Sequence, residues 1–380
     1  MKEMKVMIVV KVVKDIHRLA LGYALAITAL ALTASAWAQS SLVLYGVADV
    51  GIEYLSHADA SGNALTRMAS GNLSGSRWGL RGTEDLGGGT SALFVLESGF
   101  DIDAGTLGQA GRLFGRQAYT GLNTPYGRIT AGHQNNLLYE ILINYDAMAI
   151  APRYSAFLMD SALAGRYDNA AKYIGKFGGL TASAMYAFAR GTSVTSGATS
   201  TITSETAGNA RNDRAWSAAL EYTTGNAGAT VIYDQQQGTT GLAGQNPAQR
   251  DRRIAVAGSY AFAKAKVFAG YRWLSGDIGS TATVAARRND LFWLGASYAF
   301  TPALTLSASA YVMNDKRSAQ DPWSLVGTLD YALSKRTDGY LTLGYVKNKD
   351  GSRVGLNGIQ TSIGPGMNQL GVVAGVRHKF

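Results

Sequence analysis

The amino-acid sequence predicts an all-β protein, a sixteen-stranded antiparallel barrel that crosses a membrane. Apolar residues alternate with small or polar ones along nearly the whole chain after residue 38, which is the period of a strand with two different faces. Short and long connections alternate between these segments. The final segment, "GVVAGVRHKF", keeps this alternation up to an aromatic, Phe380, where chain ends are usually polar.

Composition narrows the protein class. The 380 residues include 46 Gly, 6 Pro and no Cys, and only 16% are charged, below the roughly 25% of soluble domains. The mean hydropathy of −0.01 argues against a helical membrane protein, and 10% aromatic residues argue against disorder. The absence of Cys excludes disulfides, thiol nucleophiles and thiolate metal sites.

The first 38 residues differ from the rest and predict a secretory signal peptide. Four lysines and Arg18 precede the apolar run "LALGYALAITALALTA", and Ala36-x-Ala38 follows it. We expect cleavage after Ala38, which leaves 39–380 as the mature domain. The alternative is a single spanning anchor, for which the run is short of the roughly 20 apolar residues usually needed.

The mature chain divides into segments of alternating polarity. In "DLFWLGASYAF", Phe292, Leu294, Tyr298 and Phe300 share one face. The sixteen predicted strands cover 41–54, 72–83, 89–101, 112–123, 126–134, 168–177, 179–190, 212–224, 227–237, 250–262, 265–275, 288–300, 303–315, 321–333, 337–349 and 367–380.

The connections support a membrane barrel over the alternative of a soluble sandwich. Tight turns such as "LGGG" and "TPYG" alternate with long loops, of which 135–167 is the longest. Long strands with short turns at one end and long loops at the other are typical of outer-membrane barrels. Lipid offers no hydrogen bonds, so the last strand is expected to pair with the first. Phe380 then belongs to the lipid face, in the periplasmic aromatic girdle.

Two pairs of arginines are predicted to face the lumen. In "SRWGLRG", Arg77 and Arg81 lie opposite Trp78 and Leu80, and in "GRLFGRQAY" Arg116 lies opposite the apolar face. By the same alternation, Arg112 lies on the same face as Arg116. A cation directed at hydrocarbon near the bilayer centre costs roughly 2–4 kcal/mol, whereas a water-filled lumen tolerates it.

Several stretches resemble the Gram-negative trimeric general diffusion porins, nearest the β-proteobacterial type. They are "SSLVLYGVADVGIEY", "SGSRWGLRGTEDLGGGTSALFVLESGF", "GRLFGRQAYTGLNTPYGRITAGHQ", "YDNAAKYIGKFGGLTASAMYAFA" and the final "GVRHKF". The resemblance implies a homotrimer in the outer membrane, with the third long loop, 135–167, folded into the barrel. It implies passive diffusion of small hydrophilic solutes and ions through a water-filled channel.

The same resemblance implies partners and site residues. Partners would be outer-membrane lipid and lipopolysaccharide, and during biogenesis periplasmic chaperones and the barrel assembly machinery, which would recognise the strand ending in Phe380. The constriction would have a basic wall of Arg77, Arg116 and Arg166, with Arg81 beside it. The inserted loop offers three acids for the opposite side, Glu140, Asp146 and Asp160, although a solvated charge or a local loop salt bridge is an equal alternative for each.

The sequence departs from the family at two points. Where the family often has "GRQ" at the end of the fifth strand, this chain has "GHQ" with His133, and the loop has "APRYSAF" in place of a Pro-Glu-Phe-Gly turn. The arginines predict a modest anion preference, to which His133 would add charge on acidification.

Trimer contacts are expected where the barrel closes. Small residues there would let barrel walls approach, and the second long loop, "DAGTLGQAGR", would latch neighbours. The small residues are Gly46, Ala48, Gly51, Gly371, Ala374 and Gly375.

Other functions find little support. No nucleophile motif accompanies the mature histidines, and "GTEDLGGGT" lacks the Lys and helix of a phosphate loop, so neither an enzyme nor a cofactor is expected. Scattered charges argue against nucleic-acid binding. No metal site is predicted, although a loop calcium site at Asp101-x-Asp103 is a minor alternative. A channel specific for a sugar or organic anion is the closest rival to general diffusion.

Overall fold

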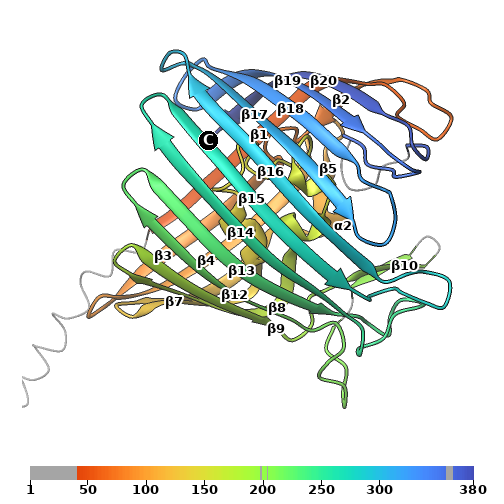
Figure 1. Cartoon of the computed structure of the whole chain (residues 1–380). Coiled ribbons are helices and arrows are strands. Elements are labelled where there is room, and N and C mark those ends of the chain that lie inside the picture. Colours follow the sequence, from red (N-terminus) through yellow and green to blue (C-terminus); the bar gives the residue numbers. More distant parts are fainter. Residues whose placement is uncertain (1–40, 197–198, 203, 357–362) are drawn as a thin grey trace, which may run out of the picture.

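The computed structural model describes residues 41–196, 199–202, 204–356 and 363–380, and the predicted signal peptide lies outside these ranges. Sixteen long antiparallel strands form one closed barrel, and the strands are tilted relative to its axis (Figure 1). Within the described ranges, no helix combines the length and apolar character needed to cross a membrane.

The prediction of sixteen barrel strands is confirmed. Their bounds are β1 (Ser41–Leu55), β3 (Arg77–Gly87), β4 (Thr90–Asp101), β6 (Gln117–Thr124), β7 (Gly127–Asn135), β8 (Arg166–Phe177), β9 (Leu180–Ala187), β12 (Ala215–Thr224), β13 (Ala227–Gln237), β14 (Arg250–Phe262), β15 (Ala265–Gly276), β16 (Arg287–Ala299), β17 (Leu304–Asp315), β18 (Trp323–Ala332), β19 (Thr337–Lys347) and β20 (Gln369–Lys379). Shorter strands are β2 (Leu65–Ser70), β5 (Thr106–Leu107), β10 (Ser193–Ser196) and β11 (Thr199–Ile202).

The two faces of the wall differ in polarity as the alternation predicts. Outward-facing side chains are large and apolar, and Leu294 and Leu220 are 66% and 50% exposed. Inward-facing positions carry buried polar groups, among them Asp234, Arg272 and Thr342. Such a wall suits hydrocarbon outside and a polar interior.

The sheet closes where β20 pairs with β1. The ladder runs from Val47 opposite Lys379 to Leu55 opposite Gly371. It extends to the last residue, because the Gly46 N–H donates to the Phe380 carbonyl over 3.0 Å and the Phe380 N–H donates back to Gly46 over 3.1 Å. The Phe380 ring covers Gly46 so closely that a Cβ there would lie 2.3 Å from the ring.

The second barrel strand differs from the predicted 72–83. Residues 71–76 leave the ladder and separate β2 from β3, and both of these strands pair with β1. The Asp49 carboxylate accepts hydrogen bonds from the backbone N–H groups of Leu73 (2.9 Å) and Ser74 (2.7 Å), which replaces the missing ladder bonds. The predicted strand 112–123 is also too long, since β6 begins at Gln117.

The segment between β7 and β8 lies inside the barrel, where Figure 1 shows its helices behind the strands. It contains α3 (Leu137–Leu142), η1 (Ala156–Leu158) and η2 (Ser161–Ala164). The Asn136 side chain caps α3 by accepting from the Tyr139 N–H and also donates to the carbonyl of Ala162. A further short element, α2 (Gly108–Gly111), is distorted by positive φ at Gln109 and Ala110.

The closure contact gives the first prediction. Gly46→Ala places a methyl group against the Phe380 ring and 2.7 Å from the backbone oxygen of Arg77, so we expect a loss of about 1–3 kcal/mol in barrel stability. Gly327→Ala is the matched control, because the nearest atom to its added Cβ is 3.9 Å away. The folded fraction is measured after refolding, as the share of protein whose mobility on a gel changes when the sample is heated. Equal folded fractions for the two variants would contradict the proposed role of the contact.

Candidate functional site

A basic cluster lies on the inner wall formed by β3, β4 and the start of β6. The Arg116 Nε donates to the Glu97 carboxylate over 2.7 Å, and the Arg77 Nε lies 3.6 Å from the other oxygen of the same carboxylate. The Tyr45 hydroxyl donates to this second oxygen over 2.9 Å. Glu97 therefore holds two arginines and a tyrosine in one network.

Glu97 is a site residue that the sequence analysis missed. It lies on β4, and Gly79, between Arg77 and Arg81 on β3, is its partner in the ladder. Its charge could have identified it, because a carboxylate within a membrane strand is not expected to face hydrocarbon. The sequence predicts acids in the long loop, whereas this carboxylate comes from the barrel wall itself.

The other two predicted arginines flank this network. The Arg166 guanidinium at the start of β8 lies 5.8 Å from the centre of the Tyr139 ring, and Arg166 is near enough to Arg77 and Arg116 for charge repulsion. Arg81 lies over the ring of Tyr45 at 5.2 Å and is exposed. Neither makes an ion pair with a described acid.

The three loop acids all contact barrel groups. Asp146 is 2% exposed and accepts hydrogen bonds from the hydroxyls of Tyr311 (2.7 Å) and Ser309 (3.2 Å) on β17. Asp160 accepts from Arg253 Nε at 2.9 Å and lies 3.0 Å from Arg272 Nε. Glu140 pairs with Lys172 on β8.

These contacts change the interpretation of the acids. Asp146 and Asp160 are buried against the wall and act as anchors of the inserted segment, whereas Glu140 is partly open to the lumen. Glu140 and Asp160 do form ion pairs, but their partners lie on barrel strands and not within the loop. Asp146 has neutral hydroxyl partners.

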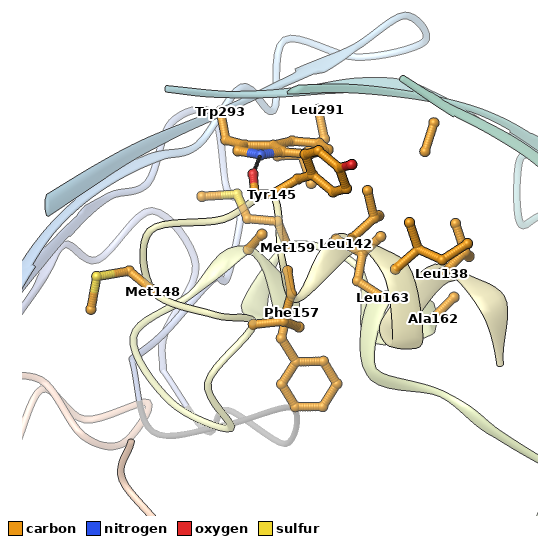
Figure 2. Close-up of a cluster of buried hydrophobic side chains, with 14 of the residues drawn as sticks. Leu138, Leu142, Tyr145, Met148, Phe157, Met159, Ala162, Leu163, Leu291 and Trp293 are labelled. Carbon is orange, nitrogen blue, oxygen red and sulfur yellow. Dashed lines mark hydrogen bonds between the residues drawn. The ribbon is translucent and has the colours of Figure 1, made fainter. Parts of the chain in front are cut away.

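An apolar core completes the attachment of the segment. Figure 2 shows Leu138, Leu142, Tyr145 and Leu163 packed toward Trp293 and Leu291 of β16. The Trp293 indole N–H donates to the carbonyl of Tyr145 over 2.9 Å. Further polar anchors are the Tyr154 hydroxyl on Glu53 (3.0 Å) and the Tyr145 hydroxyl on Glu221 (2.8 Å). The segment is thus fixed to both sides of the barrel.

Open space surrounds the inserted segment. A cavity of about 510 Å³ is lined by Arg116, Arg166 and Tyr139, and one of about 230 Å³ by Arg77 and Tyr139. A larger cavity of about 860 Å³ is lined by Glu140 and by lysines from the short-turn end of the barrel. The basic cluster therefore borders solvent-sized space on more than one side of Tyr139.

The small residues at closure do not share one face. Gly46, Ala48 and Ala374 face outward, but a Cβ on Gly371 would meet the Tyr154 hydroxyl at 2.7 Å and one on Gly375 would meet that of Tyr340 at 2.3 Å. Gly51 lies on the same inward face as Asp49 and Glu53. The expectation that all six residues flatten the outer wall was wrong, because alternate residues of a strand point to opposite sides.

Comparison with known proteins gives a consistent family. The family model described as "Gram-negative porin" matches residues 24–351. Outer membrane porin protein 32 of Delftia acidovorans is 31% identical over 94% of this chain and 99% of its own length. An outer membrane porin protein of Bordetella pertussis is 30% identical over 83% of this chain and 91% of its own length.

Solved structures agree with these relatives. The anion-selective porin from Comamonas acidovorans has a TM-score of 0.76 and 26% identity, over 90% of this chain and all of that one. The Salmonella typhi OmpF structure, at 16% identity, covers 89% of this chain with a TM-score of 0.62 and shares the fold.

The Asp146 anchor gives the second prediction. Asp146→Ala leaves the buried hydroxyls of Tyr311 and Ser309 without their acceptor, at a cost of about 1–3 kcal/mol for each unsatisfied group. We expect a folded barrel whose single-channel conductance is larger and noisier, because the inserted segment is released from the wall. Glu84→Ala, at an exposed position of β3 outside the inserted segment and outside the segment 103–112, is the control. Identical conductance and noise in both variants would show that Asp146 does not hold the segment.

Proposed function

The chain belongs to the Gram-negative porin family and is an outer-membrane porin, and on that premise we propose that it is a general diffusion channel with a mild preference for anions. The basic cluster carries this proposal. Four guanidinium groups, those of Arg77, Arg81, Arg116 and Arg166, lie around one carboxylate, Glu97, next to open lumen space. Unequal charge at the narrow part of a channel raises the local concentration of the opposite ion.

The proposed constriction differs from the one expected from the sequence. We assign Arg77, Arg81, Arg116, Arg166 and Glu97 to it, with Glu140 at its border, and assign Asp146 and Asp160 to anchoring. The inserted segment would narrow the lumen from the opposite side. The similarity to a porin described as anion-selective supports the sign of the preference.

The remaining proposals concern assembly. We propose a homotrimer, in which outward Gly46, Ala48 and Ala374 would let neighbouring walls approach. The segment 103–112 would be the latch, although α2 within it folds back onto Gly99 at the end of β4. Outer-membrane lipid and lipopolysaccharide would contact the outer face. Periplasmic chaperones and the barrel assembly machinery would act on the unfolded chain, with Phe380 as part of the recognised strand.

Liposome swelling separates general diffusion from the rival, a channel specific for a sugar or organic anion. We expect swelling rates to fall smoothly with solute size for uncharged sugars, because nothing in general diffusion depends on solute identity. Saturation by one solute at millimolar concentration would favour the specific channel, and no swelling would exclude both.

Charge substitutions test the basic cluster. Arg77→Ala combined with Arg116→Ala removes two cations and leaves Glu97, so the anion preference should fall at least twofold or invert, while Glu97→Gln should raise it. The measurement is the reversal potential in a planar bilayer at 0.1 M and 1 M salt, where screening should weaken both effects as the Debye length falls from about 10 Å to about 3 Å. A wild-type preference for cations at 0.1 M salt and pH 7 would refute the assignment.

A further inference from the structure

His133 lies at a β-bulge between β7 and β8. Gly132 pairs with Ala170 and Gln134 pairs with Tyr167, so two residues, Asp168 and Asn169, face the single position of His133. Asn169 has a positive φ of 48°, as one extra residue in a ladder often requires. The bulge directs the Asp168 carboxylate onto the imidazole, which is 9% exposed.

Both nitrogens of this imidazole face acceptors. Nδ1 contacts the Asp168 carboxylate, and Nε2 lies 2.9 Å from the carbonyl oxygen of Gly115. A neutral imidazole has one N–H and can satisfy one of these acceptors, whereas the imidazolium donates to both. The geometry therefore fits the cationic form of the ring.

The Gly115 carbonyl connects His133 to the basic cluster. The next residue is Arg116, whose backbone N–H donates to the Glu97 carbonyl over 3.2 Å and whose side chain pairs with the Glu97 carboxylate. Arg112, in the same segment, donates to Asp168 over 2.8 Å. The residues 112–116 are thus held by Asp168 at Arg112, by His133 at the Gly115 carbonyl and by Glu97 at Arg116.

We propose that His133, as an imidazolium, is a positioning residue for the channel: it fixes the segment 112–116 and so places the Arg116 guanidinium at the constriction. This rests on the proposed function of the basic cluster. Loss of the proton turns a nitrogen lone pair toward the Gly115 oxygen or toward the carboxylate, and the segment must shift to relieve the repulsion. Proton binding at His133 is then coupled to ion selectivity.

Few other charges bear on the imidazole. Asp168 faces it from β8 and Arg112 from the segment 112–116, while the guanidinium of Arg116 is directed to Glu97. The β6 residue opposite His133 is Ala118, which carries no charge. The imidazole therefore lies in a cluster with one anion, Asp168, and one further cation, Arg112.

The test uses the full-length porin in planar bilayers between pH 5 and 9, in a background with His57→Gln and His378→Gln. His57 lies in a turn and His378 is exposed on β20, so the background removes the other imidazoles of the described chain. We expect the anion-to-cation permeability ratio to fall about twofold from pH 5 to 9. A twofold fall corresponds to a change of somewhat less than one kT in the electrostatic energy of an ion in the channel. His133→Arg should hold the ratio at its low-pH value, and His133→Gln at its high-pH value.

Single-channel conductance in 1 M KCl provides an independent readout. The Debye length there is about 3 Å, so a conductance step with pH that persists reports a shift of the segment and not the charge of the ring alone. A flat conductance and permeability ratio in the background protein, or an unchanged pH dependence in His133→Arg, would overturn the proposal. A pH-dependent conductance without any anion preference would support the role of His133 and refute the proposed selectivity.

Discussion

Closure of the sheet is the constraint on which the rest of this molecule depends. A strand edge in hydrocarbon would leave a row of N–H and C=O groups without partners, each at a cost of several kcal/mol. The ladder between β1 and β20 removes that edge up to the last residue, where Gly46 and Phe380 exchange backbone hydrogen bonds. The absence of a side chain at Gly46 makes room for the terminal ring, so the end of the ladder and the aromatic girdle meet at one contact.

A closed wall with a polar inner face also explains how the inserted segment is held. Arg253 and Arg272 are almost fully buried, and burial removes the hydration of a charge, so each needs a partner of opposite charge. Here they face the lumen side and are paired with Asp160, which belongs to the segment. The same inner polarity that a channel requires therefore provides anchoring groups for the inserted segment. The apolar cluster that includes Leu142, Tyr145 and Trp293 adds an attachment that does not depend on salt.

The sequence predicted the features that follow from period-two alternation and not those that follow from three-dimensional neighbours. The strand count, the outward face of β16 and the final strand were predicted correctly because each can be inferred from local alternation. The interruption at 71–76 depends on Asp49 of the neighbouring strand, which no local pattern shows. The partners of Asp146 and Asp160 are more than 90 residues away along the chain, so sequence could not distinguish anchors from lumen charges. Glu97 could have been predicted from its charge, because a carboxylate within a membrane strand favours the lumen side.

The balance of charge in the basic cluster accounts for why the proposed anion preference is mild. Arginines placed side by side repel one another, and burial lowers the stability of each ionised group further. Glu97 offsets this by pairing with Arg116 and approaching Arg77, while Arg166 and Arg81 lie over aromatic rings, whose negative faces stabilise cations without adding a full charge. A second carboxylate would make the cluster more stable and less attractive to anions. A cluster without any carboxylate would leave adjacent guanidinium groups uncompensated. One acid among four arginines is a compromise between a wall that folds and a wall that attracts anions.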